Sequence, residues 1–440
     1  MKNIYRWSDF CLRVQVRGGI LLKNGLTGAV VFIDAKNEKE INHFISNGDT
    51  GILSTRIDEL AHPDTAILIP KNFDEYSDWR ERLIYWRNNE AHIFILHFMP
   101  TIQCQLRCDY CVEKGANRGI GMKQEIINQS RRWVIDYLDS HHEIDSFRFV
   151  LFGGEPLLQR KVVEQALETF HKLASERNIT FWTEIVTNGE FLNEETARLL
   201  SRHDWRRVQI TLDGPEGVHD LRRHGENGRP TFQNIMRNIR MLLSTRYIPK
   251  VDIRISFDAS NADRVPELIH HLAGLEVQDR INLSLGLITP TFASPSKTNT
   301  ESIIAEKALM TWKVAKDCGF LIPEEFLTGP WCVAIAKHSA VLQPDGSLQK
   351  CFCTAGRKEY NFGSIFERSE TPYLKDPRYE HFKRTDQCIK EKCQFLPLCG
   401  GGCIHNAMVE QGGSVGGKHR YCQKTLLDKM NHGLLALTYG

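Results

Sequence analysis

Apolar residues recur along residues 91–290 in two alternating patterns. Short apolar runs predict buried strands, and the segments between them have the three- and four-residue apolar spacing of amphipathic helices. Six units of strand followed by helix predict a parallel sheet with helices outside it, either a barrel or a doubly wound sheet. The expected strands are Ile93–Pro100, Phe147–Phe152, Trp182–Thr187, Val208–Leu212, Val251–Phe257 and Ile281–Leu287. The expected helices include Lys123–Leu138, Val162–Arg177, Asn193–Arg202, Phe232–Leu243 and Ala262–Leu272.

The first 90 residues predict a separate small module of strands and helices. Gly19–Asp34 has the pattern of a hairpin, with Asn24 and Gly25 as its turn signal. Such modules often bind a peptide along an exposed sheet edge, but a packing extension of the main domain fits the pattern equally well. The other elements expected here are a helix at Glu38–Ile45, a strand at Ala66–Pro70 and a helix at Asp78–Asn88 capped by Ser77.

The overall composition is that of a globular protein without a dominant charge. The net charge is +2, and 41% of the residues are hydrophobic and 25% charged. No global basic field points to nucleic acid or to a membrane surface. The chain starts with MKNIYRWSDF, which lacks the apolar stretch of a secretory signal, and no apolar run is long enough to cross a bilayer. We therefore expect a cytoplasmic protein that binds neither nucleic acid nor membrane.

The 13 cysteines are an odd number, and eleven of them fall in two groups, at 104–111 and 332–422. In a reducing compartment, clustered cysteines are more often metal ligands than disulfides. The first group reads C-Q-L-R-C-D-Y-C and follows the first predicted barrel strand. Three thiolates on one short loop can bind three corners of a metal cluster and leave its fourth metal open for chemistry.

Turn-like motifs follow three further strands of the predicted sheet. They are Gly153–Pro156 (GGEP), Thr187–Gly189 (TNG) and Leu212–Pro215 (LDGP). In barrels of parallel strands, the loops after the carboxyl ends of the strands carry the chemistry. Each motif alone is typical of a tight turn. Because all of them share this position with the cysteine loop, they predict a ligand site, in which Glu155 could hold an ammonium group.

The second cysteine group lies in residues 326–440, after a connecting helix expected at Ser302–Cys318. Its string C-Q-F-L-P-L-C-G-G-G-C has too little hydrophobic pattern to fold on a core alone, so we expect bound metal to supply folding free energy. Its eight cysteines suffice for two tetra-cysteine iron–sulfur clusters, and zinc is the alternative. The first loop has no fourth cysteine nearby, which fits a closed zinc site poorly.

Together these motifs resemble the radical S-adenosylmethionine enzymes. The C-x3-C-x2-C triplet, with Tyr110 before its last cysteine, and the GGEP motif carry the resemblance. The L-D-G-P…H-D…R run and the C-terminal cysteines resemble the subfamily with a SPASM domain, over about residues 92–430. The resemblance implies an α/β protein with a partial (β/α)6 TIM-like barrel at 91–300. It further implies a peptide-binding α+β module at 1–90, a connecting helix at 301–325 and an iron–sulfur SPASM domain at 326–440.

The resemblance also implies S-adenosylmethionine and three 4Fe-4S clusters as cofactors. The first cluster would be ligated by Cys104, Cys108 and Cys111, and its open iron would chelate the amino and carboxylate groups of S-adenosylmethionine. The residues lining that cofactor would be Tyr110, Gly153, Gly154, Glu155, Asn188, Thr211 and Arg223. The nearer auxiliary cluster would be held by Cys332, Cys351 and Cys403, with Cys353 or a substrate group completing it. The distal cluster would be held by Cys388, Cys393, Cys399 and Cys422, although four residues separate its first two cysteines where the family has two.

Enzymes of this subfamily mostly modify peptides or proteins. Sulfatase-maturating members oxidise a Cys or Ser to formylglycine and carry an Asp directly after the cysteine that matches Cys351, where this chain has Phe352. We therefore expect a maturase of ribosomally made peptides (RiPPs) that installs a carbon–carbon, ether or thioether crosslink in a precursor peptide. An external donor such as flavodoxin or ferredoxin would supply electrons. Asp213 and His219 are the candidates for a catalytic base.

Other interpretations of the same residues remain open at this point. Formylglycine formation is the alternative reaction. A zinc or iron–sulfur interaction protein, or an electron-transfer protein, would also use the C-terminal cysteines. Neither of these explains the motifs at successive strand ends, so we rank both below an enzyme.

Overall fold

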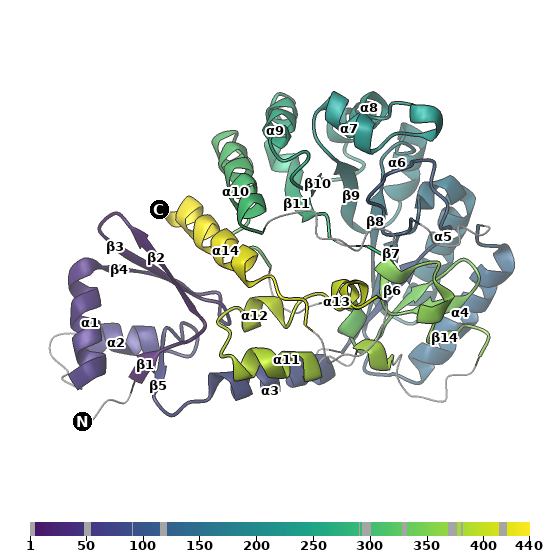
Figure 1. Cartoon of the computed structure of the whole chain (residues 1–440). Coiled ribbons are helices and arrows are strands. Elements are labelled where there is room, and N and C mark those ends of the chain that lie inside the picture. The colour runs from purple at the N-terminus through teal and green to yellow at the C-terminus, as the bar shows by residue number, and fades with distance from the viewer. Residues whose placement is uncertain are drawn as a thin grey trace.

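The computed structural model describes residues 5–47, 54–89, 91–114, 121–289, 291–292, 301–327, 332–367, 376–379, 382–412 and 420–440. A small N-terminal module lies beside a larger body built around one sheet (Figure 1). Every residue predicted to bind a metal or a cofactor falls in the described ranges. No described helix is long and apolar enough to span a membrane.

Six parallel strands form the centre of the larger body. Each pairs in parallel with the next one along the chain, which confirms the α/β class and the partial, TIM-like barrel. All six predicted strands are found, and the last two match to the residue. The strands are β6 (Ile93–Phe98), β7 (Ser146–Leu151), β8 (Thr180–Thr187), β9 (Trp205–Leu212), β10 (Val251–Phe257) and β11 (Ile281–Leu287).

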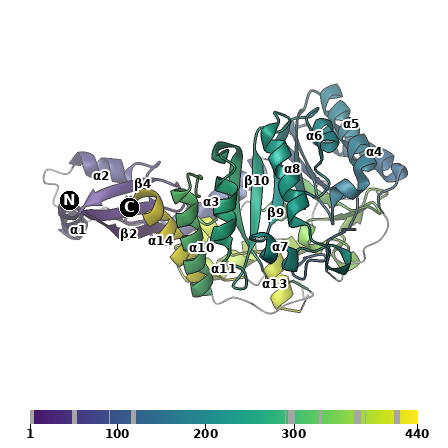
Figure 2. The same ribbon diagram turned by 90° about the horizontal axis from the view of Figure 1, so that it is seen from above.

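Helices follow these strands along the chain and lie against one face of the sheet (Figure 2). The helix α7 was not predicted, because His219 is its only buried residue and no apolar stripe marks it. The five predicted helices are confirmed with ends shifted by a few residues. The bounds are α4 (Gln124–Asp139), α5 (Arg160–Glu176), α6 (Glu194–Leu200), α7 (Glu216–Arg222), α8 (Phe232–Ser244) and α9 (Val265–Ala273).

The six strands have one apolar face and one polar face. On β10, Ile253, Ile255 and Phe257 are buried in the hydrophobic core beneath the helices. Successive side chains of a strand point to opposite faces, so Asp252 and Arg254 project from the other face. We call that polar face, opposite the helices, the inner face. One strand can therefore stabilise the core and present polar groups to a ligand at the same time.

The C-terminal region continues the same sheet. Strand β12 (Ser339–Leu342) pairs in parallel with β6, and β13 (Ser347–Gln349) and β14 (Gly363–Ser364) add antiparallel strands beyond it. The strand order is β11-β10-β9-β8-β7-β6-β12-β13-β14. Leu342 and Leu348 are buried in the barrel core, so residues 339–364 pack on that core. The contribution of bound metal to the folding of the cysteine-rich string stays a prediction.

The rest of the C-terminal region is mainly helical. The connecting helix is confirmed within one residue at each end, and α14 packs along it. Gly433 permits this close approach, because a Cβ there would lie 2.3 Å from Leu309 Cδ1. Figures 1 and 2 show α14 between the barrel and the N-terminal module. The helices are α10 (Glu301–Asp317), α11 (Phe382–Lys390), α12 (Leu396–Cys399), α13 (Ile404–Glu410) and α14 (Lys424–Tyr439).

The N-terminal module combines two small sheets with three helices. The predicted hairpin is present as β3 and β4, and β2, which the pattern did not indicate, pairs with β3 on its other side. The Asn24 side chain accepts hydrogen bonds from the N–H groups of Leu26 and Thr27 and so fixes the turn. The elements are β1 (Tyr5–Trp7), β2 (Cys11–Val16), β3 (Gly19–Asn24), β4 (Val30–Asp34), α1 (Ala35–Asn47), α2 (Ser54–Ala61), β5 (Leu68–Pro70) and α3 (Glu75–Asn89).

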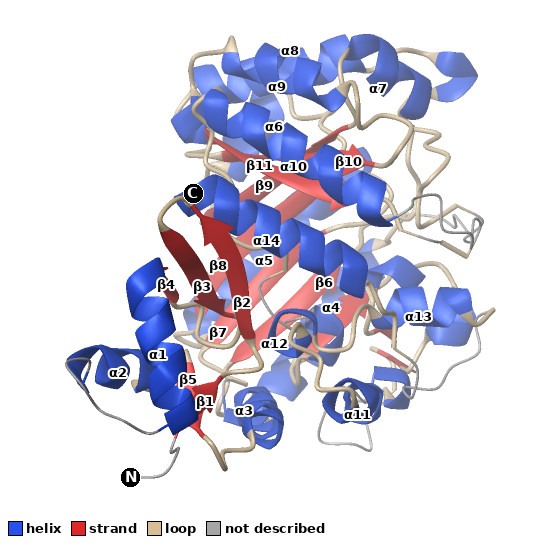
Figure 3. Cartoon of the chain, turned by 60° about the vertical axis from the view of Figure 1, so that its left-hand side comes forward, coloured by secondary structure: helices blue, strands red, loops and turns tan. Residues whose placement is uncertain are grey.

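Helix α3 begins earlier than predicted, and Asp74 rather than Ser77 caps it. Asp74 Oδ1 accepts hydrogen bonds of 3.2 Å from the N–H groups of Tyr76 and Ser77, as an N-cap side chain does. Helix α3 lies beside α11 (Figure 3), where Arg80 pairs with Asp386. The module is therefore attached to the cysteine-rich region.

Candidate active site

The loop that follows β6 carries the three cysteines of the first group. Cys104, Cys108 and Cys111 are all partly buried, and the Leu106 N–H donates a hydrogen bond to Cys104 Sγ at 3.4 Å. Burial raises the pKa of Cys104 to about 12 and that of Cys111 to about 11. Binding of metal to such thiols displaces their protons, so the charge of a bound cluster would compensate for the burial.

Two glycines after β7 let the neighbouring strand end pack directly against this loop. Gly153 has a φ of +141°, and a Cβ there would lie 2.3 Å from the Thr101 carbonyl oxygen. A Cβ on Gly154 would lie 2.2 Å from the Gln103 oxygen. The Gly154 N–H donates to Thr101 O at 3.1 Å. The glycines therefore let the cysteine loop pack closely against the end of β7. Their contact with S-adenosylmethionine stays a prediction.

Glu155 links the ends of β7 and β8. Its carboxylate is fully buried and accepts hydrogen bonds from the N–H groups of Leu157 (3.0 Å) and Asn188 (2.8 Å). The Thr187 hydroxyl lies 2.8 and 2.9 Å from its two oxygens. Burial raises the pKa of Glu155 to about 7. The carboxylate therefore braces two loops of the site, and its predicted contact with an ammonium group remains a prediction.

Asn188 connects β8 to the cysteine loop. Its Nδ2 donates to Cys104 Sγ at 3.7 Å, and its Oδ1 accepts from Gln105 Nε2 at 3.2 Å. Gln105 also donates to Glu190. The structure thus brings Asn188 to the cysteines, as the sequence predicted. Thr211 is buried on the inner face of β9, which places it on the same side of the sheet.

Tyr110 joins the cysteine loop to the end of β9. Its hydroxyl donates to Asp213 Oδ1 at 2.7 Å and accepts from Arg223 at 2.9 Å. Arg222 donates to the other Asp213 oxygen at 2.9 Å and also pairs with Asp258. Asp213 is fully buried and neutralised by two arginines. Its partners favour a positioning role over that of a catalytic base.

Arg223 carries a donor that is available to a ligand. Its Nε is buried without a hydrogen-bond partner and lies 3.8 Å from Asp213 Oδ1. Its charge lies within electrostatic range of Cys108. An orphaned guanidinium donor beside the cysteine loop fits the carboxylate of an amino-acid-like cofactor, as the sequence predicts for S-adenosylmethionine.

His219, on α7, packs against α8 and lies within electrostatic range of Arg223. It is fully buried, its Nε2 lies 3.1 Å from Thr231 Oγ1, and its ring packs on Phe232. Burial holds the pKa of His219 well below its usual value. These contacts favour a structural role, so the second candidate base is not brought to the cysteine loop.

The nearer auxiliary group collects the cysteines predicted for it. Contact with Cys351, and then burial, raise the pKa of Cys353 well above its usual value, and Cys332 and Cys403 add to the repulsion. All four thiols therefore lie close enough to interact. This arrangement offers Cys353 as the fourth ligand of a cluster, which remains a prediction.

Phe352 lies between this group and the inner face. Its ring stacks on His97 of β6 with centroids 5.6 Å apart, and it contacts Phe152 at 4.8 Å. Burial lowers the pKa of His97 to about 3, which makes its imidazole a weak base. The wall formed by these three rings is therefore apolar where a sulfatase-type member is expected to carry an Asp.

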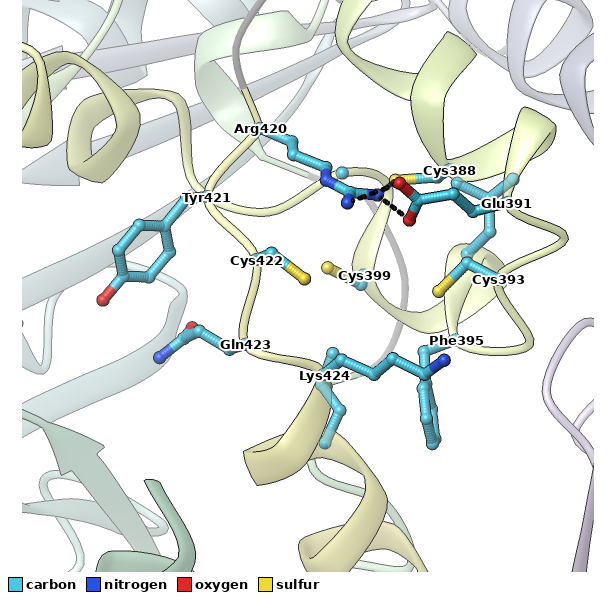
Figure 4. Close-up of a pocket in the computed structure, with 13 residues that line it drawn as sticks. Cys388, Glu391, Cys393, Phe395, Cys399, Arg420, Tyr421, Cys422, Gln423 and Lys424 are labelled. Carbon is cyan, nitrogen blue, oxygen red and sulfur yellow. Dashed lines mark hydrogen bonds and ion pairs between the residues drawn. The ribbon is translucent and has the colours of Figure 1, made fainter. Parts of the chain in front are cut away.

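The distal group surrounds a pocket at the junction with the N-terminal module. Cys388, Cys393, Cys399 and Cys422 line this pocket, and their sulfur atoms lie around it (Figure 4). Arg420 donates to Cys388 Sγ at 3.8 Å and forms a bidentate pair with Glu391. The longer spacing between Cys388 and Cys393 thus does not prevent the four thiols from meeting.

Arg384 lies between the two C-terminal groups. Its buried guanidinium is within electrostatic range of Cys332 and Cys403 on one side and of Cys388 and Cys399 on the other. Burial lowers the pKa of Arg384 to about 10. One cation thus lies close enough to interact electrostatically with both sets of thiols.

The predicted donor sets consist of thiols, which bind iron–sulfur clusters as well as zinc. A zinc ion needs its sulfur ligands within about 2.3 Å of one point, whereas the distal thiols surround a pocket. Sets made of thiols alone are typical of 4Fe-4S clusters.

Sequence reasoning missed several residues of the site. Arg222 and Asp258 complete the ion-pair network around Asp213, and Ser256 lies 3.4 Å from the Tyr110 hydroxyl. For Ser256 the available signal was the alternation of polar and apolar residues along β10, because polar residues inside a buried strand mark the inner face.

Comparison with known proteins identifies the family. The model of the radical SAM superfamily matches residues 98–272. A cysteine-type anaerobic sulfatase-maturating enzyme of Clostridium novyi is 33% identical over 337 residues, which cover 69% of this chain and 85% of that enzyme. The chain belongs to the radical SAM superfamily. The family expected from the motifs is thereby confirmed, and this radical SAM enzyme is homologous to anaerobic sulfatase-maturating enzymes.

A further relative and two solved structures are also similar to this chain. A serine-type anaerobic sulfatase-maturating enzyme of Bacteroides thetaiotaomicron is 23% identical over 364 residues, covering 73% of this chain and 84% of that enzyme. The solved structure of anSMEcpe with bound AdoMet (S-adenosylmethionine) and Cp18Cys peptide matches with a TM-score of 0.62 at 19% identity, over 78% of this chain and 98% of that one. Streptococcus suis SuiB matches with a TM-score of 0.53 at 15% identity, over 94% and 98%.

The family membership carries two consequences for this radical SAM enzyme. It implies S-adenosylmethionine and a 4Fe-4S cluster as cofactors, for which the cysteine loop supplies the ligands that the motif predicts. The curated relatives also favour the sulfatase-maturating alternative over the peptide crosslinking that Phe352 suggested. The structural matches, at these identities, show the fold alone.

Proposed function

We propose that this radical SAM enzyme oxidises a Cys or Ser side chain to an aldehyde within a peptide or protein segment bound at the inner face. The observation that carries the proposal is the position of Arg254 on that face. Its charge lies within electrostatic range of Tyr110, on the cysteine loop, and of Cys353, in the nearer auxiliary group. A substrate beside Arg254 therefore has a candidate redox centre on each of two sides.

The chain's own residues would prepare this reaction. When bound, the cofactors would supply a 5′-deoxyadenosyl radical at the cysteine loop and a one-electron acceptor at the auxiliary groups. Glu155 and Asn188 hold the cysteine loop in place, and Arg223 offers its free Nε to the carboxylate of S-adenosylmethionine. The rings of Phe352 and Phe152 exclude water from one side. The external electron donor remains flavodoxin or ferredoxin in this proposal.

The names of the relatives support aldehyde formation at Cys or Ser. A serine side chain becomes an aldehyde when it loses one hydrogen atom from Cβ, one electron, and one proton from its hydroxyl, which passes to solvent. The same losses from a cysteine side chain give a thioaldehyde, which water hydrolyses to the aldehyde with release of hydrogen sulfide. The radical source would take the hydrogen atom, and the auxiliary groups would take the electron. The identity of 33% to the enzyme of C. novyi over most of its length supports this reaction.

A second candidate is crosslinking within a ribosomally made precursor peptide. Two observations favour it: the proton acceptor expected after Cys351 is replaced by Phe352, and the chain carries an N-terminal module. The likeness to SuiB extends over 94% of the chain. In this candidate the N-terminal module binds the leader of the precursor peptide. Crosslinking also removes two hydrogen atoms, so it makes the same demand on the redox centres.

One experiment separates the two candidates. The enzyme is reconstituted anaerobically with iron and sulfide, then given dithionite, S-adenosylmethionine and synthetic peptides containing a single Cys or a single Ser. We expect 5′-deoxyadenosine together with a peptide product that reacts with a hydrazide probe, since hydrazides capture aldehydes. A product that has lost two hydrogen atoms but does not react with the hydrazide would support crosslinking instead.

The control is a variant in which the cysteine loop carries Cys104→Ala, Cys108→Ala and Cys111→Ala. This variant should form neither 5′-deoxyadenosine nor aldehyde, while keeping the iron of the C-terminal groups. If it is as active as the wild type, the loop is misassigned. If the wild type releases 5′-deoxyadenosine but alters no peptide of either kind, the proposed substrate class is wrong.

A further inference from the structure

Arginines project from three strands of the inner face, and two of them are neutralised within the protein. Arg148 on β7 pairs with Glu184 at 2.8 Å. Arg207 on β9 pairs with Asp252 at 2.7 Å and also donates to Gln209. For Arg254 on β10, the described part of the chain supplies neither a hydrogen-bond acceptor nor an ion-pair partner. Of these three arginines, Arg254 is therefore the one that the described residues leave without a carboxylate partner.

The surroundings of Arg254 are built to accommodate its side chain. In the sheet register, Arg254 lies beside Thr211 of β9 and Ser284 of β11. Two residues beyond Ser284 on β11, and on the same face, is Gly286. A Cβ there would lie 2.2 Å from the Arg254 Cζ. Any larger residue at 286 would displace the guanidinium, so the glycine leaves room for it against the edge strand.

Arg254 is only partly buried on the inner face, so its guanidinium is accessible to a ligand. Burial together with the charge of Arg207 lowers its pKa. A guanidinium presents a planar fork of donors that matches a carboxylate in a bidentate pair. A carboxylate on the inner face can therefore pair with Arg254 without displacing a partner among the described residues.

We propose that Arg254 binds a carboxylate of the peptide substrate, from an acidic side chain close to the residue that is oxidised. This inference rests on the proposed function in one respect, namely that the substrate is a peptide. It adds a specificity rule: the enzyme prefers an acidic residue near the target Cys or Ser. Arg254 then holds the segment between the cysteine loop and the nearer auxiliary group.

The position of Arg254 favours the substrate over S-adenosylmethionine as the source of the carboxylate. Arg223 already offers an unused donor next to Cys108 of the cysteine loop. Arg254 instead lies within electrostatic range of Cys353 in the nearer auxiliary group, as well as of Tyr110. Asp213 is also within range, but Arg222 neutralises it. A substrate carboxylate beside Arg254 would therefore pair with a cation that has no other ion-pair partner among the described residues.

The test measures binding without turnover. Reconstituted enzyme with bound S-adenosylmethionine, but without reductant, is titrated with pairs of fluorescent Cys peptides. The members of each pair carry Glu or Gln at one position flanking the cysteine, and the position is varied from pair to pair. We expect the wild type to bind the Glu peptide about tenfold or more tightly at one position, as charged hydrogen bonds imply. Arg254→Gln should abolish that preference, and Arg254→Lys should retain part of it because the charge remains.

Matched controls define what would overturn the proposal. Arg148→Gln removes an inner-face arginine that already has a partner, and it should keep the preference for Glu. The affinity for S-adenosylmethionine, measured by equilibrium dialysis, should be equal in wild type and Arg254→Gln. If that affinity falls in Arg254→Gln, Arg254 binds the cofactor carboxylate instead. If the wild type shows no preference at any position, or if Arg254→Gln keeps it, the proposal is wrong.

These outcomes are distinct from a failure of the proposed function. The iron content and the unfolding temperature of each variant show whether it is folded and loaded. Should Arg254→Gln fail to fold, the reduced preference expected of Arg254→Lys still tests the site. A preference for Glu that depends on Arg254 stands even if the peptides yield no aldehyde, because binding is measured without reductant.

Discussion

Tyr110 donates a hydrogen bond of 2.7 Å to Asp213, and this contact joins the loop after β6 to the loop after β9. Tyr110 lies between Cys108 and Cys111, two of the predicted cluster ligands. Arg223 donates to the same hydroxyl. The position of the cysteine loop is thus coupled to the arginine expected to bind S-adenosylmethionine, and a change at Tyr110 should affect both.

Tyr110→Phe should lower both stability and cofactor affinity. The substitution leaves Asp213 and Arg223 each without one buried partner, which costs about 1–3 kcal/mol of unfolding free energy. Denaturant titration of the reconstituted enzyme and equilibrium dialysis with S-adenosylmethionine measure the two effects. Tyr247→Phe is the control, because its hydroxyl accepts from Arg198 at 2.9 Å in an exposed position. Equal losses in the two variants would contradict the coupling described here.

Glu155 should make stability depend on pH in a defined direction. Burial raises its pKa from 4.5 to about 7, so the folded protein holds a proton that the unfolded chain releases. Its contribution to stability is therefore fully present below about pH 4.5 and is lost as the pH rises to about 7. Denaturation midpoints across this range should fall for the wild type relative to Glu155→Gln.

Glu190 is a control, because its effect on stability should change with pH in the opposite direction. Although burial opposes the change, hydrogen bonds from Arg229 and Gln105 lower the pKa of Glu190. Its contribution is therefore present above the ordinary carboxylate pKa and is lost as the pH falls below it. The stability advantage of the wild type over Glu190→Gln should grow with rising pH. A parallel trend for Glu155 and Glu190 would refute the assignment for Glu155.

Cys353→Ala should remove iron from the nearer auxiliary group. The Cys353 thiol lies with Cys351, Cys332 and Cys403, and three 4Fe-4S clusters would hold about 12 iron atoms per chain. We expect the variant to lose up to about 4 of these and to change the EPR signal of one reduced cluster. Cys318→Ala is the control, since that thiol lies beside His270, outside both C-terminal groups. An unchanged iron content and spectrum in Cys353→Ala would assign the fourth ligand to the substrate.

Arg384→Gln should shift the reduction potentials of both auxiliary clusters in the negative direction. A cation near a cluster stabilises the additional negative charge of its reduced state, and Arg384 is close to cysteines of both groups. Arg420→Gln should shift the distal cluster alone, because Arg420 contacts Cys388. Redox titration followed by EPR distinguishes the two. A shift confined to one cluster in Arg384→Gln would show that this arginine does not serve both.

Individual elements show which parts of the fold the local sequence pattern predicts. Strands β10 (VDIRISF) and β11 (INLSLGL) are predicted to the residue because apolar and polar residues alternate along each. Helix α7 was missed because only His219 faces the core. The pattern predicts Ser77 as the helix cap, but in the structure the Asp74 carboxylate accepts a hydrogen bond from the Ser77 N–H. The site was predicted in the same way: residues within motifs were identified, whereas Arg222 and Ser256 were not.

The sequence by itself determined the chemistry, because three cysteines at a fixed spacing on one loop define a metal-cluster motif without reference to distant residues. It also determined the six strands, since apolar periodicity reports local burial. Only the tertiary structure decided that β12 extends the sheet beside β6, that Arg384 lies between two sets of thiols, and that Arg254 has no ion-pair partner among the described residues. These relationships join residues far apart in the chain. They depend on which strand faces which, and no local pattern encodes that.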